Sequence, residues 1–342
     1  MPSLGDFGDF GAIDAEQSVS MTWSFDENGT LRHNPTGMRV SPDDGIQVDG
    51  QEYKISPKDI EMDRDGTLGM GAGGVVQSGT HKPTGMRVAI KRVKVDDKAK
   101  REQMLNEIKG LIQAEGCPHL VQWYAGFVEK DSGLVHVVVE LMDRGSLADL
   151  RNRCCGQGVP PQYLGTIASQ IIRGLVHLQS RRLLHRDVKP ENILHSQTGE
   201  VKLTDFGISK DLNSTLAVGQ TFVGTATYMS PERASGKEYS FQSDIWSAGL
   251  VIYELATASY PFPTNAFLEL YQHLCVLPEP RLDAAAFPPP LCDFVAQCLT
   301  RDESRRPDAV QLLQHPLIRD TGCLVGQPEV QEFAAWLATL PV

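Results

Sequence analysis

Hydrophobic and polar residues alternate over short stretches between about residue 58 and residue 142, a pattern typical of β-strands. The strands that it predicts cover residues 74–77, 87–92, 120–127 and 134–140. One stretch between them, residues 98–113, instead carries apolar residues at intervals of three and four, as an amphipathic helix does. We therefore expect a small β-rich lobe that contains one long helix.

Helical spacing of apolar residues dominates after residue 143. The predicted helices cover residues 163–181, 241–257, 265–274, 291–299 and 308–314. A β-rich lobe followed by a larger helical lobe is an α+β architecture. The cleft between two such lobes is a natural site for a ligand.

The first 57 residues follow neither pattern. Residues 1–20 are rich in Gly, Asp and Phe without any period, which predicts a mobile tail. Residues 21–57 hold short apolar pieces between turn signals, which predicts a few strands or an extended arm. The hexapeptide Pro-Thr-Gly-Met-Arg-Val occurs at 35–40 and again at 83–88. Because a solenoid needs at least three regular copies, we expect two similar turn-plus-strand pieces.

Composition and charge narrow the classes of function. The chain of 342 residues is 41% hydrophobic, enough for a sizeable core, and its net charge is −11. Such a negative chain is a poor candidate for binding nucleic acid or anionic membranes. No apolar run reaches the roughly 18–20 residues of a membrane span. The seven cysteines include no Cys-x-x-Cys pair, which favours reduced thiols.

A glycine-rich turn, Gly69-x-Gly71-x-x-Gly74-x-Val76, precedes the second predicted strand. Glycines let backbone N–H groups approach phosphates closely, although such a motif also occurs in ordinary turns. A dinucleotide-binding fold would need a helix after the turn. Since residues 74–77 are expected to be a strand, the motif predicts a β-hairpin lid.

A cation follows at the end of the next strand, in Val88-Ala89-Ile90-Lys91. A lone strand-end lysine is usually solvated, but Glu107 lies 16 residues further on, on the predicted helix. A Lys–Glu pair would hold Lys91 against nucleotide phosphates. Glu102 and Glu115 are alternative partners, and Glu107 is favoured because it shares a helix face with Leu111.

The segment His185-Arg186-Asp187-Val188-Lys189-Pro190-Glu191-Asn192 carries the strongest chemical signal, followed after thirteen residues by Asp205-Phe206-Gly207. Asp187 is a candidate base for a hydroxyl proton, and Lys189 is suited to neutralise charge on a transferring phosphoryl group. Asn192 and Asp205 offer hard oxygen ligands to Mg²⁺. Each motif alone also fits a surface turn, but their order after Lys91 favours catalysis.

These motifs together resemble the signature set of protein kinases. Four further segments resemble the MAP kinase kinase family: the activation-segment end at 222–233, the interlobe hinge at 140–147, the buried helix at 243–249 and the tail at 333–337. The resemblance covers roughly residues 60–340. It implies a bilobal fold with an N-lobe at 58–142, a C-lobe at 143–320 and a packed C-terminal helix at 321–342. The acidic extension at 1–57 is expected to be partly disordered.

The resemblance implies a role for each matching residue. Asp187, Lys189, Lys91 and Glu107 are expected to be catalytic, and Asn192 and Asp205 to bind Mg²⁺. ATP is expected to contact Leu68, Gly69, Gly71, Gly74, Val76, Ala89, Lys91, Glu140 and Met142. Val139 is the expected gatekeeper, Glu232 the expected partner of Arg306, and Thr225 the expected bridge between Asp187 and Lys189. The expected regulatory stack consists of Leu111, Phe127, His185 and Phe206.

Regulation and partners follow from the same resemblance. Thr221 occupies the second of the two usual phosphosites, but the first is Ala217, so Ser214 or Thr215 is the alternative. The expected substrate is the activation loop of a MAP kinase, at Thr and also Tyr, and the expected activator is a MAP kinase kinase kinase. Residues 1–30 contain no Lys or Arg and hence no basic docking peptide. The expected location is the cytoplasm, with the nucleus as an alternative.

Two other functions stay open. One is a Ser/Thr kinase of another tier of the cascade, which Glu191 favours and the C-terminal Phe-x-x-Trp-Leu disfavours. The other is a pseudokinase scaffold. All four residues whose loss would signal a pseudokinase are present: Lys91, Asp187, Asn192 and Asp205.

Overall fold

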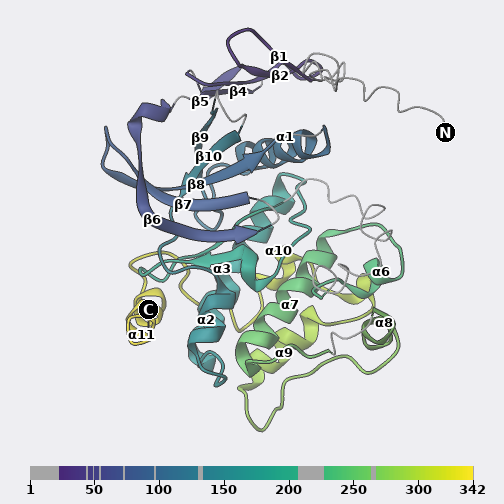
Figure 1. Ribbon diagram of the computed structural model, residues 1–342. Coiled ribbons are helices and arrows are strands. Elements are labelled where there is room, and N and C mark those ends of the chain that lie inside the picture. Colours follow the sequence, from purple (N-terminus) through teal and green to yellow (C-terminus); the bar gives the residue numbers. More distant parts are fainter. Residues whose placement is uncertain are drawn as a thin grey trace, which may run out of the picture.

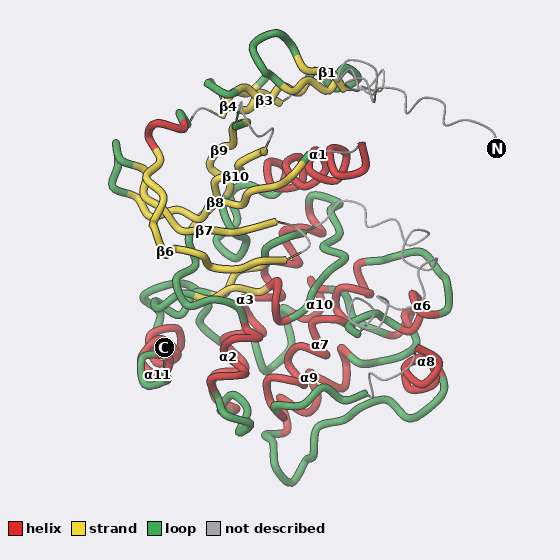
Figure 2. The backbone as a smooth tube through the Cα atoms, in the orientation of Figure 1, coloured by secondary structure: helices red, strands yellow, loops and turns green. Residues whose placement is uncertain are grey.

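The computed structural model has a small β-rich lobe above a larger helical lobe, which confirms the predicted α+β class. In Figure 1 a further small sheet lies above the upper lobe, and in Figure 2 most helices lie below it. The structure describes residues 23–43, 45–48, 50–53, 55–71, 74–95, 98–129, 134–206, 227–262 and 267–341. The tail predicted for residues 1–20 lies outside them.

The upper lobe is one antiparallel sheet and one helix. The helix, α1, spans Lys98–Gln113, as the apolar spacing predicts. The sheet has the order β6-β7-β8-β10-β9. Its strands are β6 (Ile60–Gly71), β7 (Gly74–His81), β8 (Met86–Lys94), β9 (Trp123–Val128) and β10 (Leu134–Glu140), and a short 3₁₀ turn, η1 (Pro57–Asp59), precedes them.

The lower lobe is built around α3 (Pro161–Ser180) and α7 (Phe241–Thr257), which pack against each other. The remaining helices are α2 (Leu147–Arg153), α6 (Pro231–Ala234), α8 (Phe267–Cys275), α9 (Pro289–Cys298), α10 (Ala309–Leu312) and α11 (Pro328–Leu337). A two-stranded ribbon lies on the side that faces the upper lobe, between the 3₁₀ turn η2 (Pro190–Asn192) and Asp205. Its strands are β11 (Ile193–His195) and β12 (Val201–Leu203). A further 3₁₀ turn, η3 (Glu303–Arg305), follows α9.

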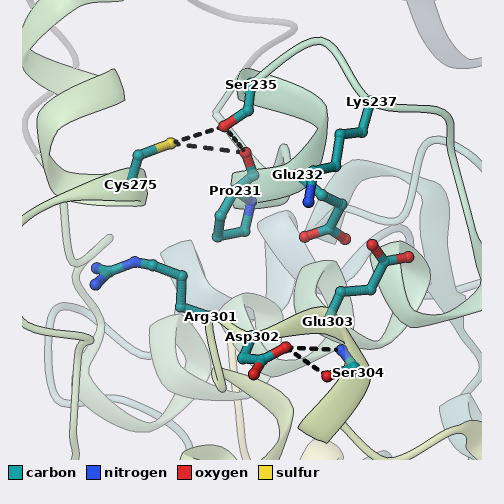
Figure 3. A pocket seen from close by; sticks show the side chains of 9 residues that line it. All are labelled: Pro231, Glu232, Ser235, Lys237, Cys275, Arg301, Asp302, Glu303 and Ser304. Carbon is teal, nitrogen blue, oxygen red and sulfur yellow. Dashed lines mark hydrogen bonds between the residues drawn. The ribbon is translucent and has the colours of Figure 1, made fainter.

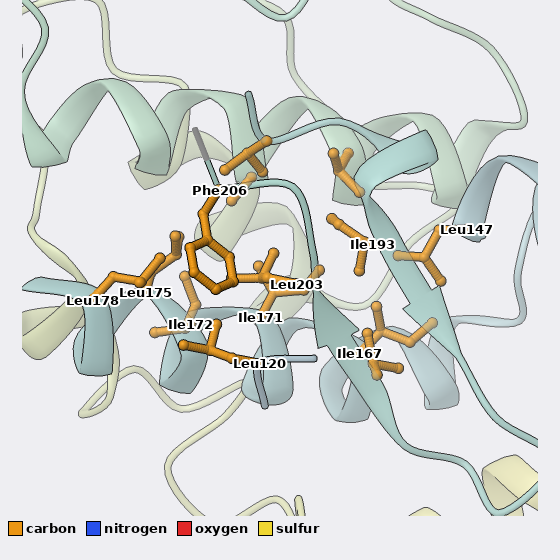
Figure 4. Packing of buried hydrophobic residues seen from close by; sticks show 14 of the residues in the cluster. Leu120, Leu147, Ile167, Ile171, Ile172, Leu175, Leu178, Ile193, Leu203 and Phe206 are labelled. Carbon is orange, nitrogen blue, oxygen red and sulfur yellow. The ribbon is translucent and has the colours of Figure 1, made fainter. Parts of the chain in front are cut away.

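The core of this lobe reaches the interlobe segment. Figure 4 shows Phe206 and Leu203 packed against Ile171 and Ile172 of α3, with Leu120 beside them. All five side chains are at most 3% exposed. The residues that follow β12 are therefore anchored on a buried helix. At the other end of the lobe, α11 packs on α3 through the buried Phe333, so the C-terminal helix lies on the lower lobe.

Residues 23–53 form a sheet of their own instead of an extended arm. It is an antiparallel meander in the order β1-β2-β3-β4-β5. The strands are β1 (Trp23–Phe25), β2 (Leu31–His33), β3 (Met38–Ser41), β4 (Gly45–Val48) and β5 (Gln51–Tyr53). Strands β3, β4 and β5 all contact β9 of the upper lobe. We call this unit the N-terminal sheet.

The repeated hexapeptide forms two matching turns, which confirms the expected pair of turn-plus-strand pieces. The first leads into β3 and the second into β8. Gly37 and Gly85 both have φ of +69°, a left-handed conformation that glycine adopts without strain. In each turn a preceding histidine contacts the threonine hydroxyl through Nδ1, at 2.7 Å from His33 and 2.8 Å from His81.

In the part of the chain that the structure describes, no helix combines the length and the apolar character that a bilayer crossing requires.

The close contact between the N-terminal sheet and β9 gives the first prediction. A Cβ on Gly126 would lie 2.6 Å from Cδ1 of Ile46 and 2.8 Å from the His136 carbonyl oxygen. Gly126→Ala is therefore expected to destabilise the fold by about 1–3 kcal/mol through overpacking. Ile46→Val removes Cδ1 and should restore part of that loss in the double variant. Chemical denaturation measures both.

Gly69→Ala is the matched control, because within the described residues a Cβ there would meet no atom within 4 Å. The account is wrong if Gly126→Ala unfolds at the same denaturant concentration as Gly69→Ala, or if Ile46→Val gives no recovery.

Candidate active site

Three residues that were predicted to contact ATP share one face of the upper sheet: Val76, Ala89 and Lys91. Val76, Lys91 and Val137 lie opposite one another on β7, β8 and β10. Ala89 lies two residues before Lys91, and side chains two apart on a strand point to the same face. The sheet thus presents Val76, Ala89 and the Lys91 ammonium together, as the sequence predicts for the wall of a nucleotide site.

Lys91 joins three separate elements. Its Nζ donates to Oε1 of Glu107 on α1 at 2.7 Å and to Oδ1 of Asp205, beyond β12, at 2.8 Å. The side chains of Lys91 and Glu107 are only 13% and 18% exposed, which limits screening by water. Glu102 instead accepts a hydrogen bond from Trp23, and Glu115 follows the end of α1. Of the three glutamates considered, Glu107 is the one that the structure pairs with Lys91.

The charges of this cluster reinforce one another. Burial works against the charge of Lys91, but the carboxylates of Glu107 and Asp205 outweigh it and raise the pKa of the ammonium. Burial also raises the pKa of Glu107, and Lys91 opposes that change. The ammonium therefore keeps its proton throughout the physiological range.

The catalytic-loop residues converge on Asp187. Lys189 Nζ donates to Oδ2 of Asp187 at 2.9 Å, and Asn192 Nδ2 donates to the same oxygen at 2.8 Å. The Nδ2 of Asn192 also bonds the Asp187 carbonyl oxygen at 2.9 Å. This arrangement fixes the carboxylate and directs the Asn192 amide oxygen away from Asp187. The structure thus brings together the residues predicted to act as base, cation and metal ligand.

A buried carboxylate beneath the loop was missed by the sequence analysis. Asp244 of α7 accepts the backbone N–H of His185 and that of Arg186, both at 2.9 Å, and the hydroxyl of Tyr239 at 2.6 Å. Arg186 has φ of +67°, a strained value for a non-glycine residue that these bonds help to maintain. Burial raises the pKa of Asp244. The available signal was an acidic residue at the start of a largely apolar helix.

The glycines of the β6–β7 hairpin differ in whether packing requires a residue without a side chain. Gly74 has φ of +115°, and a Cβ on it would overlap the Arg92 carbonyl oxygen of β8. It is required by the close approach of two strands. Gly69 has no atom within 4 Å of its Cβ position, so no packing within the described residues demands a glycine there. Gly71 pairs with Gly74 at the hairpin end, and Leu68 is half exposed. The open space at Gly69 fits a ligand that needs room.

The segment between the lobes is fixed by an ion pair. Glu140 Oε1 lies 2.6 Å from Nζ of the buried Lys202, and its Oε2 accepts the Gln122 backbone N–H at 3.2 Å. The Glu140 N–H donates to the Gln122 carbonyl oxygen at 2.9 Å. Any backbone bond from Glu140 to a ligand must therefore use its carbonyl oxygen. Met142 follows two residues later and is buried.

The hydrophobic stack requires one correction. Phe127 belongs to a separate buried cluster with Val88, Ile90 and Val138, and its ring stacks on His136. The larger cluster that holds Leu111 and Phe206 takes Trp123 from β9 instead. The register between β9 and β10 shifts there, because Val138 faces Ala125 and Val139 faces Trp123, so Tyr124 is an extra residue. A bulge reverses the alternation of faces, which simple alternation along the strand could not predict.

His185 and Phe206 do contact each other edge to face, with ring centroids 6.1 Å apart. His185 is fully buried, which lowers its pKa although Asp244 opposes the change. The ring is therefore neutral near pH 7.

The expected pair of Glu232 and Arg306 is confirmed. The guanidinium contacts both carboxylate oxygens, at 2.8 and 3.0 Å, and both side chains are almost fully buried. Arg306 also lies over the ring of Trp246 in α7. Removing one partner of such a pair typically costs about 3–5 kcal/mol because the other charge stays buried. The pair thus fixes α6 on the lower lobe.

A polar hollow of about 440 Å³ lies beside α6, and it shares no lining residue with the cluster around Lys91 and Asp187. Figure 3 shows Cys275 and Ser235 both directed at the Pro231 carbonyl oxygen on one side of it, and Asp302 bonded to Ser304 on the other. Glu232 and Arg301 bond to groups behind the lining, such as Arg306 and the Leu274 carbonyl oxygen, and we assign the hollow no ligand.

The predicted phosphosites lie outside the described residues. These are Thr221 and, for the other phosphosite in place of Ala217, Ser214 or Thr215. Ala217, Thr225 and Gly207 lie outside them as well.

Asn192 and Asp205 fit a magnesium ion that is shared with phosphates. Both offer hard oxygen atoms, and Mg²⁺ is usually held by one or two protein oxygens together with substrate phosphates and water. Within the described residues, no group of three or more His, Cys, Asp or Glu could hold a metal by itself. Two hard oxygen donors, one amide and one carboxylate, are the protein share that a metal–phosphate complex takes.

Comparisons with known proteins agree with this geometry. Residues 62–318 match the family described as the protein kinase domain. The chain is 37% identical to mitogen-activated protein kinase kinase 2 of Arabidopsis thaliana over 305 residues, which is 85% of this chain and 82% of that protein. It is 36% identical to mitogen-activated protein kinase kinase 1c of Physcomitrium patens over 308 residues, which is 86% of this chain and 87% of that protein.

The contact between Lys91 and Glu107 predicts coupled effects on catalysis. Lys91→Met and Glu107→Gln should each lower kcat/KM for phosphoryl transfer from ATP. The double variant should lose less than the sum of the two effects, by about 0.5–3 kcal/mol, because either change breaks the same pair. Steady-state kinetics of the four proteins complete the cycle.

Glu115→Gln provides the matched control, since it removes one exposed charge just beyond α1. Its effect should simply add to that of Lys91→Met. Strict additivity for Glu107→Gln as well would mean that Glu107 does not act through Lys91.

Proposed function

The chain belongs to the MAP kinase kinases, a family of protein kinases, and from this premise we propose that it phosphorylates the activation loop of a MAP kinase. One observation carries the catalytic part of the proposal. Lys91 connects α1 to Asp205, while Asp187 is held by Lys189 and Asn192 in the adjoining loop. These are the parts that phosphoryl transfer requires at one place.

ATP would lie under the β6–β7 hairpin. The chain's contribution there is the apolar face of Val76 and Ala89, the space at Gly69 and the backbone of Glu140 and Met142. Asn192 and Asp205 would hold Mg²⁺, which neutralises charge on the phosphates when bound.

Catalysis would rest on positioning and charge more than on covalent chemistry. Asp187 would orient the substrate hydroxyl and accept its proton, with its carboxylate already fixed by Asn192. Lys189, 2.9 Å from Asp187, would place a positive charge beside the transferred group. Lys91 would orient the phosphates, and Glu107 would keep Lys91 in place.

The substrate and the activator come from the family. The relatives are named mitogen-activated protein kinase kinases, which supports a MAP kinase as substrate and an upstream MAP kinase kinase kinase as activator. Activity on both Thr and Tyr is the family's expected specificity. Location in the cytoplasm or the nucleus remains a prediction from the resemblance.

A panel experiment tests the proposal. The activated chain is incubated with ATP, Mg²⁺ and candidate MAP kinases whose own catalysis is disabled, and phosphosites are read by mass spectrometry. We expect phosphate on the Thr and the Tyr of one activation loop. Phosphate on Thr alone would remove dual specificity, and transfer only to other kinases of the cascade would favour a different tier.

Asp205→Asn is the control for that panel, because it keeps the side-chain size but removes the charge expected to bind Mg²⁺. It should lower turnover to less than about a tenth, which corresponds to roughly 1.4 kcal/mol of barrier. Wild-type protein without any transfer, together with ATP binding, would instead indicate a pseudokinase scaffold.

Phosphorylation of Thr221 is expected to switch the enzyme on. A phosphate adds about −1.5 to −2 charge and three acceptor oxygens. The exposed Arg186 lies beside Asp187. Burial lowers the pKa of Arg233, and the positive charge of Arg186 nearby lowers it further. These two cations would attract the phosphate.

Thr221→Ala should therefore retain only basal activity after treatment with an upstream kinase, while Ser214→Ala or Thr215→Ala should lose less. Phosphosite mapping and activity assays measure both effects. Full activation of Thr221→Ala would contradict this assignment.

A further inference from the structure

Helix α1 has two working faces. Glu107 points to Lys91, and Glu102 points to the N-terminal sheet. The two glutamates are five residues apart, which places them about 140° apart around a helix of 3.6 residues per turn. Because α1 moves as one body, a shift of the helix at Glu102 would also change the position of Glu107 relative to Lys91.

The N-terminal sheet packs tightly on this side of the upper lobe. Five of its side chains are at most 1% exposed: Trp23, Leu31, Met38, Val40 and Ile46. They belong to the same buried cluster as Met104, Leu105 and Ile108 of α1. Figure 1 shows the sheet above β9, β10 and α1. Its burial is as complete as that of a domain core, so it is an integral part of the lobe.

One polar contact joins the N-terminal sheet to the Glu102 side of α1. The indole N–H of Trp23 donates to Oε1 of Glu102 at 3.0 Å. The ring of His33 packs on Trp23, with centroids 4.6 Å apart, and its Nε2 lies 3.8 Å from the same Glu102 oxygen. Trp23 is buried and has this N–H as its sole side-chain donor, so the bond to Glu102 is the polar contact that ties this part of the sheet to α1.

The charges within α1 do not follow its helix dipole. Between Lys98 and Gln113 the helix has no acidic residue in its first turn and no basic residue in its last turn. Its tertiary contacts, including the bond from Trp23 to Glu102, therefore contribute to its position.

We propose that the N-terminal sheet is a positioning element for catalysis, and that Trp23 and Glu102 are its positioning residues. By holding one face of α1 they keep Glu107 on the other face against Lys91. This inference rests on the role given to the Lys91–Glu107 pair in the proposed function, and it adds a requirement for residues 23–53.

Variants of Glu102 in the full chain test the proposal. Glu102→Ala removes the acceptor for Trp23, and we expect about a fivefold loss of kcat/KM and about fivefold faster hydrogen exchange of the α1 amides. Glu102→Gln keeps an acceptor oxygen and should stay within twofold of wild type in both measurements. Glu115→Ala, the control at an exposed site beyond α1, should also stay within twofold of wild type in both measurements. Trp23→Phe removes the N–H together with the five-membered ring of a buried indole, so it should lose at least as much as Glu102→Ala in both measurements.

A second background separates positioning from general stability. In Glu107→Gln the catalytic pair is already weakened, so adding Glu102→Ala should lower kcat/KM by less than twofold. A residue that only stabilises the fold would cost the same fivefold in both backgrounds, and that result would overturn the proposal. So would a Glu102→Gln variant as impaired as Glu102→Ala.

The hydrogen-exchange measurement does not depend on activity. If the wild-type chain transferred no phosphate, the proposed function would fail, while the exchange of α1 would still show whether Trp23 and Glu102 hold the helix. If the Glu102→Ala protein is active and its α1 amide hydrogens exchange as in wild type, the inference is wrong while the proposed function still holds.

Discussion

The ammonium of Lys91 is the interaction on which the arrangement of this protein depends. It is the contact that joins β8, α1 and the segment after β12, through Glu107 and Asp205. Lys91 and Glu107 are largely buried, so an unpaired ammonium there would be unfavourable, while Asp205 on the other side is 45% exposed and adds a weaker contact between the lobes. The geometry expected of a nucleotide-phosphate site follows from an electrostatic necessity of the fold.

The lower lobe meets this constraint with buried charges of its own. Asp244 fixes the backbone at His185 and Arg186, and the pair of Glu232 and Arg306 fixes α6. Each of these groups is satisfied by several hydrogen bonds, the condition under which buried charge specifies a single arrangement. The catalytic loop therefore has a rigid base, while its chemistry faces the other lobe.

Much of the site was predictable because its chemistry requires fixed residue types at short spacing. The loop around Asp187 and the segment from Val88 to Lys91 are of this kind, although β8 continues to Lys94 instead of ending at Lys91. The boundaries of α1 were predictable from its apolar spacing. What could not be predicted depends on distant contacts or on local irregularities. Trp23 and Glu102 are 79 residues apart in sequence. The bulge at Tyr124, which exchanges Trp123 for Phe127 in the hydrophobic stack, leaves no mark in the pattern of apolar residues.

The meander of residues 23–53 has a consequence for how the chain folds during synthesis. Each strand pairs with the next one along, so its contacts are local and would be available before residues 98–113 are synthesised. Its apolar face, with Trp23, Met38 and Ile46, would wait for residues 104–128 to emerge. Until then that face would be exposed to water, and it is the one that a chaperone would need to shield.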